Sequence, residues 1–393
     1  MPKVLLKDVV VRIKDKVDKD NTELEFYIGG EHFDNGEIQI TKKGVIKDST
    51  IGPAFHMRFQ PGDVLLMSRN PHLRKAGVVD FEGICSDVSY VCRTKDENVL
   101  MQRFIPFIFQ TDHFWKFAEE NKKGSTNFFL NWSDFEKYEF DLPVIEEQRK
   151  LCEMMWAFED TKTAYKQLLQ KTDDLVKSQF IEMFGDPYTN PKGWEIGTIE
   201  DVMIGKASNG FFAKPADYSS DGNAGIICVG DVVNRKYSNV TGLRRANADD
   251  KQFQKFKVQY GDMLFCRSSL VKEGIAKASI VPAECDEDIL FECHVIRVRL
   301  DIDRVVPEFM QAFTITDYFR TQMMDKSKTA TMTTIGQKDV ISGGIYIPDM
   351  ELQKQFAEFA EQSDKSKFEL KQAIADIDNL MKTFMTQNRE KEE

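Results

Sequence analysis

The side chains best suited to bind a metal ion or to act as nucleophiles are few and widely spaced in this chain. The five histidines are His32, His56, His72, His113 and His294. None lies at metal-ligand spacing from another histidine or from a cysteine pair, so each is interpreted as a surface or hydrogen-bonded core residue. The seven cysteines are an odd number, and spacings such as Cys85/Cys92 and Cys285/Cys293 fit neither a disulfide framework nor a zinc site. The sequence therefore predicts no metal centre and a reduced, cytoplasmic protein.

Sequence signatures of catalysis and nucleotide binding are also missing. The chain has no G-x-x-x-x-G-K-[ST], no G-x-G-x-x-G that begins a helix, no G-x-S-x-G and no H-E-x-x-H. No Pro-Asp…Glu-x-Lys nuclease arrangement occurs either. Asp186-Pro187-Tyr188 is similar to the D-P-P-Y loop of amino-methyltransferases, but it lacks the second proline and lies in a turn-rich linker. These absences favour a protein that binds and positions other molecules.

Length and charge limit the class of protein further. The chain has 393 residues, of which 41% are hydrophobic, and this predicts two or three folded domains. It contains no run of 18 apolar residues and no apolar signal segment at its N-terminus. The net charge of −11 excludes a non-specific polycation, but residues 1–141 carry only −3 and residues 185–347 only −2. A local basic face on each of these segments is compatible with this distribution.

The second half of the chain repeats the first at two fixed offsets. With an offset of 205, TDHF at residues 111–114 corresponds to TDYF at 316–319, and with an offset of 199, QPGDVL at 60–65 corresponds to QYGDML at 259–264. The change of offset implies six additional residues in the second half, around residues 284–290. Matches in the same order over about 80 positions indicate a tandem duplication. Further pairs are Phe104/Phe309, Lys123/Lys328, Pro143/Pro348 and Gln148/Gln353.

Each half ends in a long run without Gly or Pro, in which mostly apolar residues are spaced alternately four and three apart. Such a heptad pattern is typical of coiled-coil helices, and at 1.5 Å per residue each helix would be about 55–60 Å long. We expect the two helices to pair antiparallel; the open alternative is that each packs on its own domain. Polar Thr161, Thr172, Ser363 and Ser366 weaken the seam but can fix its register. The apolar seam residues are Leu151, Met154, Phe158, Tyr165, Leu168, Leu175, Leu352, Phe356, Phe359, Leu370, Ala373, Ile377, Leu380 and Phe384.

The other two segments show the patterns of compact mixed domains. Apolar or β-branched runs at residues 4–11, 64–67, 77–79, 88–91, 226–229, 263–266 and 295–300 predict strands. Residues 100–121 and 307–325 predict aromatic-rich amphipathic helices. The predicted fold class is α+β, with two similar globular α/β domains joined by two long antiparallel coiled-coil helices in a pseudo-twofold internal repeat. The predicted parts are a first globular domain at 1–141, a central helical spacer at 142–184, a linker at 185–193, a second globular domain at 194–347 and a distal helical spacer at 348–393.

These features resemble the specificity subunit of type I restriction–modification systems over essentially the whole chain. GDVLL at residues 62–66 and GDMLF at 261–265 resemble the glycine–aspartate strand motif of the family's target-recognition domains. Residues 142–148 and 347–353 resemble the proline-then-glutamine segment at the start of its shared helices, and residues 184–195 resemble the junction after its central helix. The order of these motifs and their duplication are what make the resemblance specific.

The resemblance implies that segments 1–141 and 194–347 are target-recognition domains, each reading one half of a bipartite, asymmetric site in double-stranded DNA. The paired helices would space the half-sites about one helical turn apart. They would also bind two modification (methyltransferase) subunits, and restriction or translocase subunits would complete the complex. This chain is expected to be non-catalytic, to hold no cofactor and to contact no membrane, because S-adenosylmethionine, ATP and Mg²⁺ are expected in the partner subunits.

Candidate DNA contacts rest on side-chain chemistry, because base-reading residues lie in the variable parts of the family. Arg and Lys pair with guanine or phosphate, and Asn and Gln pair with adenine. The alternative for each single candidate is a solvated surface charge; recurrence in both halves favours Arg69, Lys75, Lys123, Arg267, Lys272 and Lys328. The full set is Arg69, Asn70, His72, Arg74, Lys75, Lys122, Lys123, Asn127, Arg244, Arg245, Arg267, Ser268, Lys272, Lys326 and Lys328.

Two readings from other classes remain open at this stage. One is an enzyme, a DNA methyltransferase or nuclease with degenerate motifs, which would bind S-adenosylmethionine. The other is a structural coiled-coil scaffold that joins two partner-binding domains without reading DNA. The acidic net charge adds the hypothesis that the isolated chain binds DNA weakly and needs its modification subunits for useful affinity.

Overall fold

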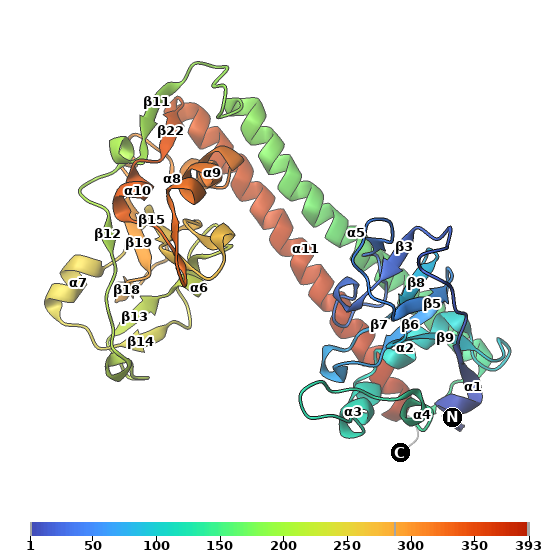
Figure 1. Ribbon diagram of the computed structural model, residues 1–393. Helices are drawn as coiled ribbons and strands as arrows, with labels where there is room; N and C mark the ends of the chain where they lie inside the picture. Colours follow the sequence, from blue (N-terminus) through green and yellow to red (C-terminus); the bar gives the residue numbers. More distant parts are fainter. Residues whose placement is uncertain (1, 287, 391–393) are drawn as a thin grey trace. The chain divides into compact units, whose positions relative to one another are not determined.

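The structure of the protein is a computed structural model that describes residues 2–286 and 288–390. The chain divides into two compact units. The first comprises the chain up to Gln167 together with the chain from Leu370 onward, and the second runs from Leu168 to Glu369. Each unit therefore holds one globular domain and parts of both long helices (Figure 1).

The globular part of the first unit contains two four-stranded sheets, with strand orders β2-β9-β6-β7 and β4-β3-β8-β5, and a ribbon of β1 and β10. Strand β6 is buried on both faces, because Val64 and Leu66 pack with the helices and Leu65 and Met67 pack with the second sheet. The strands are β1 Lys3–Leu5, β2 Val10–Ile13, β3 Phe26–Ile28, β4 Gly44–Val45, β5 Phe55–Phe59, β6 Val64–Met67, β7 Ala76–Val78, β8 Gly83–Ser86, β9 Ser89–Thr94 and β10 Glu139–Asp141. The helices are α1 Leu6–Val9, α2 Ile105–Phe109, α3 Asp112–Glu120 and α4 Trp132–Phe135, with 3-10 turns η1 Gly30–His32, η2 Pro71–Leu73 and η3 Gln102–Phe104.

The globular part of the second unit has the sheets β12-β19-β15-β17, β14-β13-β18 and β16-β21-β20, and a ribbon of β11 and β22. Strand β15 is again buried on both faces, with Met263 and Phe265 on the helix side and Leu264 on the other. The strands are β11 Glu195–Thr198, β12 Ser208–Asn209, β13 Ala224–Ile227, β14 Arg244–Ala246, β15 Asp262–Cys266, β16 Ser268–Ser269, β17 Ala278–Ile280, β18 Ile289–Phe291, β19 Val295–Arg299, β20 Lys328–Thr329, β21 Thr333–Thr334 and β22 Gly344–Ile347. The helices are α6 Val229–Val232, α7 Asp250–Phe256, α8 Pro307–Thr314, α9 Asp317–Lys326 and α10 Gln337–Ile341, with 3-10 turns η4 Ile199–Val202, η5 Pro215–Asp217 and η6 Lys272–Gly274.

The predicted duplication is present in the topology of the two units. Strand β6 lies between β9 and β7 as β15 lies between β19 and β17, and β3 pairs parallel with β8 as β13 does with β18. The first and last strands of each globular domain pair antiparallel, β1 with β10 and β11 with β22. Thr111 and Thr316 cap equivalent helices, accepting hydrogen bonds from Phe114 N at 3.2 Å and Phe319 N at 3.4 Å.

Three predicted elements are divided in the structure. The predicted strand at 4–11 is two strands separated by α1, because β1 pairs with β10 whereas β2 joins a different sheet beside β9. The predicted helix at 100–121 is η3, α2 and α3, because Thr111 caps a new helix and Gln110 bonds Ala76 O at 2.6 Å. The predicted helix at 307–325 likewise divides into α8 and α9 at the Thr316 cap. Propensity alone does not show such breaks when apolar residues continue through them.

The two long helices are α5 Ile145–Phe184 and α11 Met350–Glu390, and they pair antiparallel within each unit (Figure 1). In the first unit the rings of Phe158 and Phe384 stack at 6.1 Å, and in the second Phe180 meets Phe356 at 5.5 Å. The antiparallel pairing is therefore confirmed. The predicted domain boundaries stay a prediction, since the compact units divide within both helices.

The seam between these helices differs from the predicted one, mainly on α5. Predicted seam residues Leu168, Leu175 and Leu380 are 47%, 51% and 46% exposed. The buried positions of α5 lie one residue further along, at Cys152, Met155, Glu159, Lys162 and Phe180. On α11 the prediction holds better, with Phe356 and Ile377 buried; the other predicted seam residues on both helices, Leu151, Met154, Phe158, Tyr165, Leu352, Phe359, Leu370, Ala373 and Phe384, are half-buried.

The reason for this difference is an ion-pair cluster inside the seam of each unit. Lys162 is 4% exposed in its side chain and pairs with Glu159 at 2.9 Å and Asp378 at 3.3 Å. At an offset of 205, Lys367 pairs with Asp364 at 2.7 Å and Asp173 at 3.1 Å. A hydrophobicity pattern predicts that charged residues are exposed. When charged residues lie in the seam, the pattern therefore places the buried positions one residue away from where they are.

One buried glutamine joins each long helix to its globular domain. Gln148 and Gln353 are both 0% exposed. Gln148 accepts from Met101 N at 3.0 Å and donates to Val99 O at 2.8 Å and Pro143 O at 2.7 Å. Gln353 accepts from Val306 N at 2.9 Å and donates to Pro348 O at 2.8 Å. All of these bonds form away from water, so the side-chain amide fixes where the helix begins.

The cysteines are all free thiols. Burial raises the pKa of Cys152 to about 11 and that of Cys228 to about 12, so these thiols stay protonated at neutral pH. The described residues contain no group of three or more His, Cys, Asp or Glu that could hold a metal ion. Among the same residues, every helix is too short or too polar to cross a bilayer.

The observed seam predicts different costs for two neighbouring methionines. Met155→Ala removes a side chain that is 2% exposed and should lower the free energy of unfolding by about 3 kcal/mol. Met154→Ala, at the predicted seam position, should cost about 1 kcal/mol because that side chain is half-buried. Urea denaturation followed by tryptophan fluorescence measures both, and equal losses would contradict the observed register.

Candidate nucleic-acid interface

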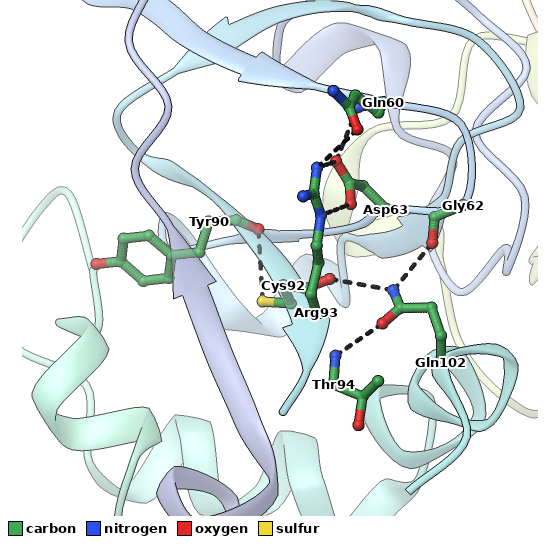
Figure 2. Close-up of polar contacts among 8 residues, drawn as sticks. All are labelled: Gln60, Gly62, Asp63, Tyr90, Cys92, Arg93, Thr94 and Gln102. Atoms are coloured by element: carbon green, nitrogen blue, oxygen red, sulfur yellow. Dashed lines mark hydrogen bonds and ion pairs between the residues drawn. The ribbon is translucent and has the colours of Figure 1, made fainter. Parts of the chain in front are cut away.

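The glycine–aspartate motif forms a turn that fixes the start of β6. Gly62 has φ +88°, a backbone conformation that favours glycine. Asp63 is 3% exposed and accepts from Gln60 N at 2.7 Å, and it pairs with Arg93 of β9, whose Nη2 lies 2.8 Å from Oδ2. Gln102 completes the turn by donating to Gly62 O at 2.9 Å and accepting from Thr94 N at 2.7 Å (Figure 2).

The second half repeats this turn with the same chemistry. Gly261 has φ +82°, and Asp262 is fully buried and accepts from Gln259 N at 3.0 Å. Arg299 of β19 binds Asp262 bidentately, with Nε–Oδ1 at 2.8 Å and Nη2–Oδ2 at 2.9 Å. Both aspartates are therefore framework residues, and they hold the central strands whose far ends carry the candidate DNA loops.

In the first half the structure brings the two candidate loops together. The segment after β6 pairs with the segment at 128–130: Asn70 N donates to Phe128 O at 2.9 Å, and Leu130 N donates to Ser68 O at 2.9 Å. Lys123 in turn exchanges two backbone hydrogen bonds with Phe129, at 2.8 and 3.0 Å. Residues 69–75 and 122–127 therefore form one surface, called here the first basic surface.

Half of the candidate side chains on the first basic surface are already paired. Ion pairs or hydrogen bonds join Arg74 to Asp112 (2.5 Å), Lys75 to Gly30 O (2.6 Å), Lys122 to Glu119 (2.6 Å) and Lys123 to Asp134 (2.7 Å). The hydrogen bond from Lys123 also lowers the pKa of Asp134. These cations stabilise the loops themselves.

The other candidates on this surface remain open to a ligand. Arg69 is exposed beside the Phe129 ring, 5.8 Å from its centroid. Within the described residues, no hydrogen bond or ion pair involves the side chains of Arg69, Asn70, His72 or Asn127. Asn70 and Arg74 have φ of +52° and +50° on either side of η2, so the loop holds a defined, left-handed geometry at both ends.

The second half also joins its two candidate loops, through a small sheet. Ser268 and Ser269 of β16 pair with Thr334 and Thr333 of β21, and β21 pairs with β20, which carries Lys328. Turn η6 with Lys272 follows β16 directly. Residues 267–272 and 326–328 are called here the second basic surface.

Several candidates of the second half are also engaged. Arg267 donates to Cys293 O at 3.0 Å, Ser268 is buried with its Oγ 3.1 Å from His294 Nδ1, and Lys326 donates to Ser342 O at 2.8 Å. Lys272 and Lys328 are exposed, and neither side chain has a hydrogen bond or ion pair within the described residues. They are the open cations of this surface.

Arg267 and Arg69 do not occupy equivalent positions in the two halves. Backbone pairing aligns Arg267 with Ser68, because Arg267 N bonds His294 O and Ser68 N bonds Val88 O, each at the same place in the fold. Arg69 therefore corresponds to Ser268, and neighbouring strand positions point to opposite faces, which explains why Arg267 turns inward.

The pair Arg244 and Arg245 is not part of the second basic surface. Both lie on β14, in the sheet with β13 and β18. Arg245 is held by Asp288 at 2.5 Å and Gly222 O at 2.7 Å, and Arg244 lies 4.0 Å from the centre of the Tyr218 ring.

Sequence reasoning missed Arg12 of β2. Its guanidinium lies 4.2 Å from the centre of the Tyr90 ring, and its Nη2 donates to Asp87 O at 3.2 Å. Tyr90 in turn donates to Leu130 O at 3.1 Å, next to the first basic surface. The sequence signal that could have identified it is an arginine within the short β-branched run at residues 10–13.

Comparison with known proteins shows what the chain is similar to. The family model described as type I restriction modification DNA specificity domain matches residues 6–172. The type I restriction enzyme EcoKI specificity subunit of Escherichia coli (strain K12) is 21% identical over 379 residues, which cover 90% of this chain and 78% of that protein. The MjaIX specificity subunit of Methanocaldococcus jannaschii is 24% identical over 193 residues, covering 44% of this chain and 41% of that protein.

Two solved structures have a similar fold. A structure described under complex assembly and conformational transition of the type I R-M system has a TM-score of 0.55 at 17% identity, over 98% of this chain and 96% of that one. The type I restriction–modification S subunit from M. genitalium has a TM-score of 0.57 at 10% identity, over 98% and 94% of the two chains. The predicted fold class is confirmed by these similarities.

The framework role of the Asp–Arg pair can be tested in the second half. Arg299→Met leaves the fully buried carboxylate of Asp262 without its partner and should lower the free energy of unfolding by about 3 kcal/mol. Lys272→Met, on the exposed second basic surface, should change it by less than about 0.5 kcal/mol. Urea denaturation provides the measurement, and an R299M variant as stable as the parent would show that the pair does not support the fold.

Proposed function

Because the chain belongs to the family of type I restriction–modification DNA specificity subunits, we propose that each globular domain reads one half of a bipartite site in double-stranded DNA. The observation that carries this proposal is the paired-loop surface that follows the central strand in both halves. Asn70 pairs with Phe128 in the first, and Ser268 pairs with Thr334 in the second. Arg69 on the first surface and Lys272 and Lys328 on the second are exposed cations without an ion pair among the described residues, and contact with DNA requires such groups.

The open side chains divide by the contacts that their chemistry allows. Arg69 suits guanine or phosphate, and Asn70 and Asn127 suit adenine. Lys272 and Lys328 suit phosphate or guanine. The cations already in ion pairs, such as Lys123 with Asp134, support the geometry of the loops. The paired cations would hold the loops in place, and the open side chains would orient the domain on the duplex and recognise its bases.

The two halves should recognise different sequences. The first basic surface offers a mixture of arginine, amides and His72, whereas the second offers two lysines and small hydroxyl residues on β16 and β21. Side chains of different chemistry select different bases. The complete site is therefore expected to be asymmetric.

The chemistry of modification and cleavage is assigned here to partner subunits. We propose that α5 and α11 bind two modification subunits and set the spacing of the half-sites, and that restriction or translocase subunits complete the complex. The similarity to a specificity subunit and to a structure of a type I R-M assembly supports this arrangement. S-adenosylmethionine, ATP and Mg²⁺ would then act in those partners, and the complex would work in the cytoplasm, where the cell's DNA is.

The acidic net charge of −11 is expected to lower the affinity of the isolated chain for DNA. Affinity for DNA comes largely from phosphate contacts, and many cations of this chain are engaged in ion pairs. We therefore expect the isolated chain to bind its site weakly at 150 mM salt and the complex with modification subunits to bind it tightly. Nanomolar affinity of the isolated chain under these conditions would contradict this expectation.

The proposed function predicts a change in the methylation of the host genome. Deleting the gene should abolish adenine methylation at one bipartite, asymmetric motif, and returning it should restore that methylation. Long-read sequencing of native DNA measures the result and gives both half-sites. An unchanged methylome in cells that express the modification subunits would favour a scaffold, and binding of S-adenosylmethionine by the purified chain would favour an enzyme.

A single open arginine should affect only the half-site of its own domain. Arg69→Ala should weaken binding by about 1–3 kcal/mol if the side chain pairs with guanine, and it should relax selectivity only in the half read by the first domain. Competition binding by the complex with modification subunits, using sites substituted in either half, measures this effect. Lys116→Ala, an exposed cation on α3, serves as the control and should leave selectivity unchanged. Loss of selectivity in the other half would contradict the assignment.

A further inference from the structure

The second unit contains a cavity of about 580 Å³ outside the second basic surface. Its walls come from α5, α8, α9 and α11 and from the segments before β17 and around residue 235. Basic residues predominate in the lining over acidic ones. The basic residues are Lys177, Arg235, Lys236, Lys277, Arg320 and Lys367, and the acidic residues are Asp173, Glu308 and Asp364.

Part of this positive charge is neutralised within the cavity wall. Asp364 pairs with Lys236 at 2.6 Å and with Lys367 at 2.7 Å. Asp173 pairs with Lys367 at 3.1 Å, and Lys277 donates to Asn234 at 2.6 Å. Asp173 and Asp364 thus neutralise two lysines, Lys236 and Lys367, whereas the cavity lining contains six basic residues.

Three cations of the wall have capacity left for a ligand. Lys177 and Arg235 are exposed, and within the described residues neither side chain forms a hydrogen bond or ion pair. Nη1 of Arg320 is enclosed and finds no hydrogen-bond partner among the described residues, whereas Nη2 donates to Glu273 O at 2.9 Å. An enclosed guanidinium nitrogen without an acceptor is costly, so Arg320 keeps unused hydrogen-bonding capacity in the cavity wall.

The first unit fills the equivalent space with apolar side chains. At an offset of 205, Ala312, Ala360 and Val176 correspond to Phe107, Met155 and Met381. These larger residues are buried together in one cluster of the first unit. The duplication therefore places a packed core in one half where the other half has a cavity, so the cavity is not a consequence of the fold itself.

The charges of the cavity are also particular to the second unit. Backbone hydrogen bonds from Val78 N to Ile38 O and from Ile280 N to Lys236 O, both 2.8 Å, align Ile38 with Lys236. The same alignment places Glu37 opposite Arg235. Arg320 corresponds to buried Trp115 at an offset of 205. Three cations of the second unit thus stand where the first has an apolar or acidic residue.

We propose that this cavity binds phosphate groups of the DNA backbone beside the half-site that the second domain reads. The link to the DNA surface is Arg320, since it bonds Glu273 of η6, the turn that carries Lys272. Arginine and lysine bind phosphate through charge-assisted hydrogen bonds, and these contacts position a domain on DNA without reading sequence. The inference rests on the proposed function and extends it, because it gives the second domain an additional hold on the duplex that the first domain lacks.

The test uses two kinds of variant of the full chain in complex with modification subunits. Lys177→Ala with Arg235→Ala removes two open cations, and Ala312→Phe installs the residue that the first half holds at the equivalent position, Phe107. Lys251→Ala, which removes one exposed cation of α7 outside the cavity, is the control for loss of surface charge. The measurement is the dependence of affinity on salt, between about 50 and 200 mM, for a duplex that contains the recognised site.

Loss of two phosphate contacts should reduce the slope of log affinity against log salt by about 1.8 for the double variant. Ala312→Phe should also reduce it, while K251A keeps the parental slope. If the parent complex binds no duplex, the proposed function and this inference both fail. If the parent binds and the cavity variants match it, only this inference fails. If the variants keep the parental slope but lose a modification subunit on gel filtration, the cavity holds an acidic protein segment and the assignment to DNA is overturned.

Discussion

A buried amide at the start of each long helix is the constraint on which the arrangement of each unit depends. Gln148 and Gln353 are enclosed, and their amides bond to backbone groups of both the helix start and the globular domain. A buried amide with an unpaired group is costly, so the helix can begin in only one position relative to its domain. The seam, the ion-pair cluster and the walls of the cavity all follow from that position, because they are built from the turns of helix that come next.

The polar residues of this protein divide into those that hold the framework and those that stay open. Asp63 and Asp262 of the glycine–aspartate turns pair with arginines of the neighbouring strand and accept a backbone hydrogen bond within the turn. Most cations of the candidate loops are similarly engaged, which leaves Arg69, Lys272 and Lys328 without an ion pair among the described residues. This division explains how an acidic chain can still present basic surfaces: the acidic partners lie beneath or beside the loops and fix them, and a few cations extend outward.

The elements predictable from sequence were those with a repeated local signal. The offsets of 199 and 205 located equivalent strands, caps and helix starts, because a duplicated frame keeps its turn glycines and capping threonines. The seam of α5 was placed one residue out of phase because Glu159 and Lys162 are buried as a pair, which hydrophobicity cannot indicate. Arg267 corresponds to Ser68 in the backbone pairing, so its side chain and that of Arg69 face opposite sides of the strand. The cavity could not be predicted from the sequence, because it depends on the space that four helices and two neighbouring segments leave unfilled.

The pairing of first and last strands in each globular domain has a consequence for how such a protein can change. β1 lies beside β10 and β11 beside β22, so the chain arrives at and departs from each domain on strands about 5 Å apart. A segment with adjoining ends can be exchanged for a foreign one without rerouting the chain around it. One recombination event between such ends would replace a whole reading surface, with its ion pairs and loops intact, and leave the other half of the specificity as it was.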